Sequence, residues 1–268
     1  IYGVYSEGFR TGGVNRGRTD FSTFPVTYDS DTVENMEFGV KATLADGRVQ
    51  ANVSVYMMDW TDVQVEIVDP SNNVEIGEDE VWQQIVANLD DAKISGLDAD
   101  ITAMVGQNLE VGFNLTWINE NEVSSSPVAD DRFFSGYADL GLDSKSELPL
   151  FADRSYSMYM TYSFDTADFG LGAGNGYLTL MHSYEGESLN QLTGSTQAPR
   201  EAQGDYRITD LTMGFEYESW QATLFARNLT DERGITYKDN SDFDRKFGWA
   251  TYFVTPPRQI GLSIRLNF

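Results

Sequence analysis

Cysteine is absent from the 268-residue sequence, and histidine occurs once, at His182. The lack of cysteine excludes disulfide frameworks, thiolate metal sites and cysteine nucleophiles. A single histidine leaves little material for histidine-based metal binding or proton transfer. Lysine and arginine are scarce, with 18 residues against 42 aspartates and glutamates, which gives a formal net charge of −24. This deficit argues against a nucleic-acid partner, because phosphate contacts need clustered basic side chains.

Long apolar runs are missing as well. No stretch approaches the roughly 18 consecutive apolar residues of a membrane-spanning helix, and the mean hydropathy is −0.37. That average still permits a membrane β-barrel, in which only every second residue of a strand faces lipid. Hydrophobic residues make up 41% of the chain, too many for a disordered acidic tail. Because the sequence starts within a strand-like pattern and without a signal peptide, we expect Ile1 to be an internal point of a longer protein.

Apolar residues recur at every second position through most of the chain. The alternation from Met36 to Leu44, the Asp46-Gly47 turn and the alternation from Val49 to Met57 predict a long hairpin. Its second strand is expected to continue to Ile67. Similar alternation predicts further strands over 97–105, 109–117, 156–164, 177–184, 211–217, 220–226 and 260–268.

The predicted connections alternate in length. Tight turns are expected near residues 46, 107, 170 and 218, and long polar segments at about 10–32, 69–86, 123–152, 186–204 and 229–248. Short turns on one rim and long loops on the other are typical of an outer-membrane barrel. The fold class is therefore all-β, a transmembrane antiparallel β-barrel with about ten strands in this chain, most of them longer than the roughly five or six residues usual in soluble sheets.

Aromatic residues near the predicted strand ends fit this interpretation, because amphipathic rings favour the level of the lipid headgroups. The alternative is that they are ordinary core or cross-strand residues of a soluble β-sandwich. The residues are Trp60, Trp117, Tyr156, Tyr217, Trp220, Trp249 and Tyr252.

Five stretches resemble, in order and spacing, segments of TonB-dependent outer-membrane receptors, which import ferric siderophores and other scarce nutrients. They lie at 5–15, 33–41 leading to 56–64, 88–100, 226–232 and 257–268. On its residue types alone, the Asn228-Leu229-Thr230-Asp231 part is first a strand-stop signal, because three of its side chains can bond local backbone. The resemblance spans essentially the whole chain.

The resemblance implies a location in the bacterial outer membrane, a barrel of 22 strands, and an N-terminal plug domain that fills it. We expect residues 1–268 to be the C-terminal portion of that barrel, with the plug, its TonB-contacting segment and the earlier strands outside this chain. The implied function is active uptake of a scarce ligand, foremost a ferric siderophore, energised by the TonB-ExbB-ExbD complex through the plug. No enzymatic activity and no cofactor are implied.

Two further partners follow from the resemblance: the outer-membrane lipids, and the barrel-assembly machinery, for which the terminal Phe268 resembles the recognition signal. Two alternative functions remain, a soluble glycan-binding β-sandwich and a small omptin-like barrel protease. Omptin-type enzymes use an Asp-x-His pair, and here Leu180 stands two residues before His182. A structural histidine is therefore the better interpretation.

Ligand capture is expected in the long loops and at strand ends that face the lumen. Rings can stack on a catecholate or a sugar, and arginines can bind an anionic chelate; packing of the loops against one another is the alternative role of these rings. The acidic clusters, such as residues 78–80, lack the spacing of a calcium loop, so no metal site is assigned. The candidates are Arg10, Arg16, Arg18, Phe21, Phe24, Trp82, Phe133, Phe134, Tyr137, Tyr237, Phe243 and Phe247.

Overall fold

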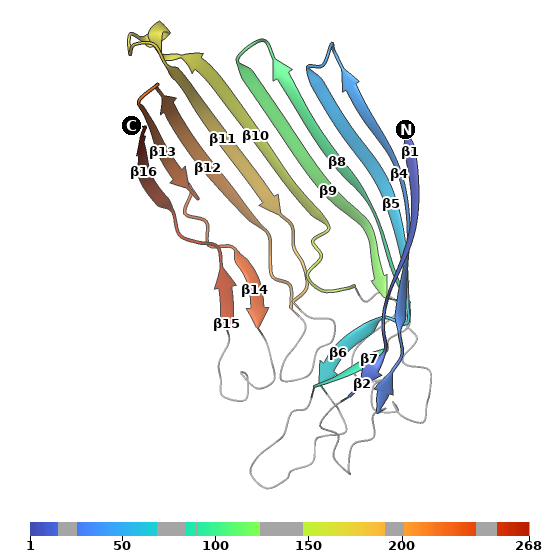
Figure 1. Cartoon of the computed structure of the whole chain (residues 1–268). Helices are drawn as coiled ribbons and strands as arrows, with labels where there is room; N and C mark the ends of the chain where they lie inside the picture. Colours follow the sequence, from blue (N-terminus) through green and yellow to red (C-terminus); the bar gives the residue numbers. More distant parts are fainter. Residues whose placement is uncertain are drawn as a thin grey trace.

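The computed structural model describes residues 1–15, 26–68, 84–88, 91–123, 147–190, 201–239 and 251–267. In this part of the chain, ten strands form one antiparallel sheet in the order β1-β4-β5-β8-β9-β10-β11-β12-β13-β16 (Figure 1). The strands are β1 (Tyr2–Arg10), β4 (Asp31–Leu44), β5 (Val49–Thr61), β8 (Ala92–Val105), β9 (Leu109–Val123), β10 (Arg154–Asp165), β11 (Asn175–Glu185), β12 (Tyr206–Glu216), β13 (Trp220–Arg227) and β16 (Gln259–Leu266).

Tight turns and long connections alternate along this sheet, as the sequence predicts. Short turns join β4 to β5, β8 to β9 and β12 to β13, and a connection that contains the 3₁₀ helix Thr166–Phe169 joins β10 to β11. Ala45 and Asp46 have φ values of 53° and 56°, the positive backbone angles of a tight hairpin turn. Figure 1 shows these connections at one end of the sheet with both termini, and the long connections at the other. No helix in the described ranges is long and apolar enough to cross a membrane.

The expected extension of the second strand to Ile67 is wrong. β5 ends at Thr61, and Asp62 takes a φ of 56°. The next residues form β6 (Gln64–Val68), which pairs with β7 (Gln84–Asn88) in a separate two-stranded sheet. Alternation of apolar and polar residues predicts that a segment is a strand, but it does not predict which strand pairs with it.

Two other short hairpins lie within the long connections. β2 (Gly13–Val14) pairs with β3 (Thr27–Tyr28), and β14 (Ile235–Asp239) pairs with β15 (Thr251–Val254). The sequence prediction places β2, β3 and β14 within polar loops, at about 10–32 and 229–248. In the structure, each of these two long connections instead contains a pair of short antiparallel strands.

The two faces of the ten-stranded sheet differ in chemistry. The face called here the outer face is apolar and exposed; Phe38 on β4 and Ile260 on β16 are 65% and 70% exposed. A protein in water would cover such a face, whereas lipid solvates it. One register row on this face runs through Leu44, Val49, Ala103, Val111, Met160, Leu180, Leu211, Ala226 and Ile260.

The opposite face, called here the inner face, carries mainly polar residues and a repeated contact between tyrosine and glycine. A Cβ atom on Gly112 of β9 would lie 2.0 Å from the ring of Tyr159 on β10, and one on Gly39 would lie 2.4 Å from Tyr2. The same contact joins Gly96 to Tyr56 and Gly214 to Tyr177. Each ring therefore occupies space that only glycine leaves free on the neighbouring strand.

A small hydrophobic cluster lies where β8 and β9 approach the long connections. Its buried residues are packed against Met58 and Trp60 of β5. A single curved sheet has no second layer to build a larger core from, so these side chains stabilise the base of the loops. The ten-stranded sheet excludes the soluble β-sandwich, which needs two packed sheets. The cluster contains Val63, Ala92, Ile94, Ile118, Val123 and Leu148.

Candidate functional site

Arg10 at the end of β1 and Asp31 at the start of β4 form an ion pair at the base of the long loops. The Nε atom of Arg10 lies 3.0 Å from Oδ2 of Asp31, and the guanidinium lies 5.0 Å from the centroid of the Trp60 ring. Nε1 of Trp60 and the backbone N–H of Gln64 also donate to this carboxylate, at 2.9 and 3.1 Å. The residues therefore tie β1, β4, β5 and β6 together.

The carboxylate of Asp31 is 1% exposed and lies at the loop end of β4, beyond the apolar stretch that begins at Met36. Burial alone would raise its pKa. The hydrogen bonds from Arg10, Gln64 and Trp60 outweigh this effect and lower the pKa of Asp31 to about 2. The group is therefore ionised at all physiological pH values.

Two asparagines join the first two long loops. Asn15 donates through Nδ2 to the carbonyl of Val86 and accepts through Oδ1 from its N–H, both at 2.8 Å. Asn88 accepts from the N–H of Asp29 at 2.7 Å and donates to the carbonyl of Asp62 at 2.8 Å. Side chains thus replace strand pairing between segments that are distant in sequence.

The segment 226–232 closes the long loop between β13 and β16. Asn228 is 4% exposed with a φ of 49°, and its Nδ2 donates to the carbonyls of Glu232 and Pro256 at 2.9 and 2.7 Å. Asp231 accepts from the N–H of Arg258 at 2.8 Å. This hydrogen bond, with the charges of Arg233 and Arg258, lowers the pKa of Asp231. Two stretches that carry the resemblance therefore bind each other.

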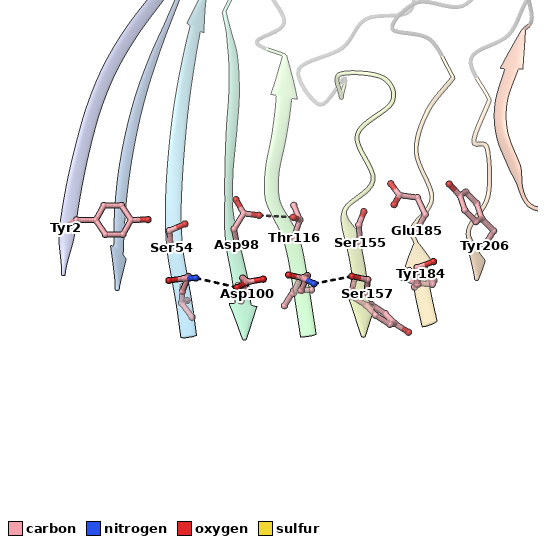
Figure 2. Close-up of a pocket in the computed structure, with 17 residues that line it drawn as sticks. Tyr2, Ser54, Asp98, Asp100, Thr116, Ser155, Ser157, Tyr184, Glu185 and Tyr206 are labelled. Carbon is pink, nitrogen blue, oxygen red and sulfur yellow. Dashed lines mark hydrogen bonds between the residues drawn. The ribbon is translucent and has the colours of Figure 1, made fainter. Parts of the chain in front are cut away.

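The inner face is hollowed across β5 to β12 (Figure 2). The hollow has a volume of about 470 Å³. Oγ1 of Thr116 donates to Oδ1 of Asp98 at 2.7 Å, and Nδ2 of Asn52 lies 3.4 Å from Oδ1 of Asp100. Figure 2 shows that the labelled side chains come from successive strands. They include Tyr2, Ser54, Asp98, Thr116, Ser155, Glu185 and Tyr206.

A second hollow, of about 370 Å³, lies at the loop end of the sheet. Tyr237 of β14 is part of its lining, and the ring centroid of Tyr237 lies 5.9 Å from that of Phe253 on β15. Burial and the nearby Asp239 raise the pKa of Tyr237, so its phenol stays protonated and able to donate. The lining residues are Leu150, Glu185, Gly186, Ser188, Gln203, Gly204, Tyr206, Ile235, Thr236 and Tyr237.

Two of the sequence-predicted ligand residues lie in the part of the chain that the structure describes. Arg10 belongs to β1 and Tyr237 to β14, which Figure 1 shows toward opposite edges of the sheet. The structure therefore does not bring these two residues together. The other candidates lie outside the described residues: Arg16, Arg18, Phe21, Phe24, Trp82, Phe133, Phe134, Tyr137, Phe243 and Phe247, together with the expected assembly signal Phe268.

Sequence reasoning misplaced Trp60 and missed the inner hollow. Trp60 does not point to lipid headgroups, because the acceptor of its N–H is the buried carboxylate of Asp31. Several hollow residues, such as Asp98 and Thr116, come from strand interiors, whereas the prediction placed the ligand site in the long loops and at the strand ends that face the lumen. The polar members of each alternating strand are the signal that identifies this face.

The single histidine lies on the outer face. Nδ1 of His182 is 2.9 Å from Oγ1 of Thr209, and its ring centroid is 6.2 Å from that of Tyr156. Throughout the ranges that the structure describes, no group of three or more His, Cys, Asp or Glu residues is placed to hold a metal ion. His182 thus has a hydrogen-bond partner on the neighbouring strand, in agreement with a structural role.

Comparison with known proteins supports the same architecture. A family model described as "TonB dependent receptor-like, beta-barrel" matches residues 1–229. The chain is similar to the ferric-catecholate import receptor Fiu of E. coli K12, with a TM-score of 0.66 and 13% identity over 98% of this chain and 32% of that one.

Two other solved structures are similar to the chain. The ferripyoverdine receptor of the Pseudomonas aeruginosa outer membrane has a TM-score of 0.62 and 17% identity, over 98% of this chain and 30% of that one. The copper transporter OprC has a TM-score of 0.60 and 12% identity, over 90% of this chain and 32% of that one. The chain spans about a third of the length of these proteins.

These relatives are transport proteins of the bacterial outer membrane, not enzymes, and their likeness confirms the antiparallel barrel fold. The family model covers most of the sequence, including three of the five stretches that carry the resemblance and the start of the fourth, at 226–232. The chain belongs to the family of TonB-dependent receptor β-barrels.

Proposed function

We propose that residues 1–268 form the C-terminal part of the barrel wall of a receptor that takes up a scarce ligand, such as a ferric siderophore, with energy supplied through TonB. The two-faced sheet carries this proposal. Its outer face suits lipid, and its inner face presents hydroxyl, amide and carboxylate groups around the inner hollow. Two proteins that share the fold are, by name, a ferric-catecholate import receptor (Fiu) and a ferripyoverdine receptor.

In this proposal the wall binds and guides the ligand and performs no bond chemistry. The anchored bases of the long loops, built around Asp31, Asn88 and Asn228, hold the loops over the entrance. The loops and the inner face capture the ligand. The TonB-ExbB-ExbD complex then acts on the plug to open the path inward, and the barrel-assembly machinery inserts the wall through a signal that ends at Phe268.

Uptake assays in the native host test this proposal. The gene for the receptor and, separately, the gene for TonB are deleted, and uptake of ⁵⁵Fe bound to a panel of siderophores is followed under iron limitation. We expect one panel member to lose uptake in both deletions and to regain it when the receptor is restored. Uptake that depends on the receptor but persists without TonB would contradict the energised mechanism. The panel is extended to haem, cobalamin and oligosaccharides. If uptake of none of these ligands depends on the receptor, the proposed uptake function is contradicted.

A further inference from the structure

The basic side chains of the middle strands all avoid the inner face. In β8 to β12 the strand registers place these residues on the outer face, and β5 contains none. They are Lys93, Arg154, His182 and Arg207. The inner face of the same strands carries the carboxylates of Asp98, Asp100, Glu110, Asp165, Glu185, Asp210 and Glu216.

The two hollows on this side are continuous in their lining. Glu185 and Tyr206 belong to both linings, so the hollow at the loop end adjoins the hollow of the inner face. Together their linings extend from the β14 hairpin to the middle of β5. Serine, threonine and tyrosine hydroxyls and side-chain amides supply most of the polar atoms, and no lysine, arginine or histidine lines either hollow within the described residues.

Two lysines lie near the passage without being part of its lining. Nζ of Lys238 donates to the carbonyl of Ala202 at 2.6 Å and lies 3.5 Å from Oε2 of Glu201. Lys41 of β4 lies over the ring of Tyr2, 5.2 Å from its centroid. Neither ammonium is part of the lining, so the carboxylates of the passage have no basic partner within the lining itself.

We propose that the two hollows form one passage that selects an uncharged or cationic ligand rich in hydroxyl or amine donors and disfavours anionic chelates. This inference rests on the proposed uptake function and names its substrate class. Carboxylates and hydroxyl oxygens accept hydrogen bonds from donors on the ligand. An anionic ligand meets like charges along the passage and has no arginine or lysine there to offset them.

The test uses the full-length receptor with three probes: a cationic ferric trihydroxamate, a ferric tris-catecholate and an uncharged oligosaccharide. Binding to the purified receptor and uptake by cells are both measured. Glu185→Gln and Asp98→Asn remove charge from the passage at nearly constant volume. Glu122→Gln on the outer face of β9 is the matched control. Heat-modifiable migration on gels shows that each variant assembles.

We expect the wild type to bind the trihydroxamate or the oligosaccharide at least tenfold more tightly than the catecholate. The double variant Glu185→Gln/Asp98→Asn should narrow this preference at least threefold, and the control variant should retain it. Uptake of the catecholate in preference to both other probes would overturn the inference while leaving the uptake function intact. An unchanged preference in an assembled double variant would also overturn it. Failure of every probe, and of the wider uptake panel, would remove the proposed function and the inference together.

Discussion

At the scale of single residues, buried polar side chains hold the bases of the long loops. Asp31 accepts from a guanidinium, an indole and a backbone amide, and Asn228 bonds two carbonyls across its loop. Both are nearly inaccessible to solvent. Their chemistry is that of buried polar groups whose partners are satisfied, which makes their removal costly.

Asp31→Asn should lower the free energy of unfolding by about 1–3 kcal/mol at neutral pH, because the charge-assisted bond to Arg10 is lost while the shape is kept. The pKa of Asp31 is about 2 in the fold and about 3.9 in an unfolded chain. Its contribution is therefore complete above about pH 4 and disappears as the pH falls towards 2.

Denaturant titrations of the refolded receptor at several pH values check this effect. The difference between wild type and Asp31→Asn should be constant from pH 5 to 8 and shrink below pH 4. A difference that stays constant down to pH 2 would show that the charge of Asp31 contributes nothing. Asp168→Asn, in the exposed 3₁₀ helix at the other end of the sheet, serves as the control.

Asn228→Ala should loosen the long loop between β13 and β16. The substitution leaves the carbonyls of Glu232 and Pro256 and the N–H of Glu232 without their side-chain partner, at a cost of about 1–3 kcal/mol. Limited proteolysis of the receptor should then cut within residues 229–258 several times faster than in wild type. Thr230→Ala, within the same loop, is the comparison. Equal cutting rates in wild type and Asn228→Ala would contradict the role of Asn228 in closing the loop.

Individual contacts were predicted less well than residue positions. The sequence marks Asn228 as a strand stop, because asparagine bonds local backbone, and the structure agrees. Trp60 was assigned to the lipid headgroups, yet it donates to a carboxylate that is distant in sequence. Alternation of apolar and polar residues predicts which face a side chain is on only when the strand register is known. At the end of a strand it does not predict which residue a side chain will contact.

At the scale of strands, the tyrosine–glycine contacts set the spacing and register of the inner face. In each of the four pairs an acidic residue lies two positions from the glycine, and Tyr159 donates to one of them, Glu110, at 2.8 Å. Ring packing and a hydrogen bond thus act on the same pair of strands. A register slip of one residue would place the ring on the opposite face from its glycine.

Gly112→Val should impair assembly because a Cβ atom at this position would overlap the ring of Tyr159. We expect a destabilisation of about 1–3 kcal/mol from forced displacement of the ring, and less folded protein in the outer membrane. Ala103→Val, on the outer face of β8, adds a side chain where lipid accommodates it and should have little effect. The folded fraction is measured by heat-modifiable migration. A normal folded fraction for Gly112→Val would show that the contact is dispensable.

The strands of the main sheet were predictable, whereas the short hairpins were not. Long alternating runs, such as 36–44 and 49–57, have a period of two that identifies a strand even when its exact ends are predicted wrongly. β6 has the same period but joins β7, and β14 lies inside a segment that was expected to be a polar loop, where it pairs with β15 just beyond that segment. The inner hollow was missed for a related reason. It is lined by the polar residues of the alternating strands, whereas the strands were identified from their apolar residues.

At the scale of the whole molecule, the ten-stranded sheet has two unpaired edges in the described residues. β1 pairs only with β4, and β16 only with β13. A lipid-exposed edge leaves backbone N–H and C=O groups without partners, each at a cost of several kcal/mol. Closure therefore requires additional strands, which agrees with the proposal that the chain is part of a larger wall.

Residues 1–268 produced alone should form associated species in detergent, because β1 and β16 offer pairing edges to other copies. Size-exclusion chromatography with light scattering should show dimers and larger species, and the shift of folded barrels on heating should be lost. The full-length receptor, measured in the same detergent, is the control. A monomeric, heat-modifiable species of residues 1–268 would contradict the need for further strands.

The apolar stretch of β4 also sets a preferred membrane thickness. From Met36 to Leu44 the chain advances eight residues, which is about 27 Å at roughly 3.4 Å per residue. With a strand tilt of about 40°, the vertical height is close to 20 Å. This wall matches a thin hydrocarbon layer, so lipids with short acyl chains should match it with less bilayer distortion than long-chain lipids do.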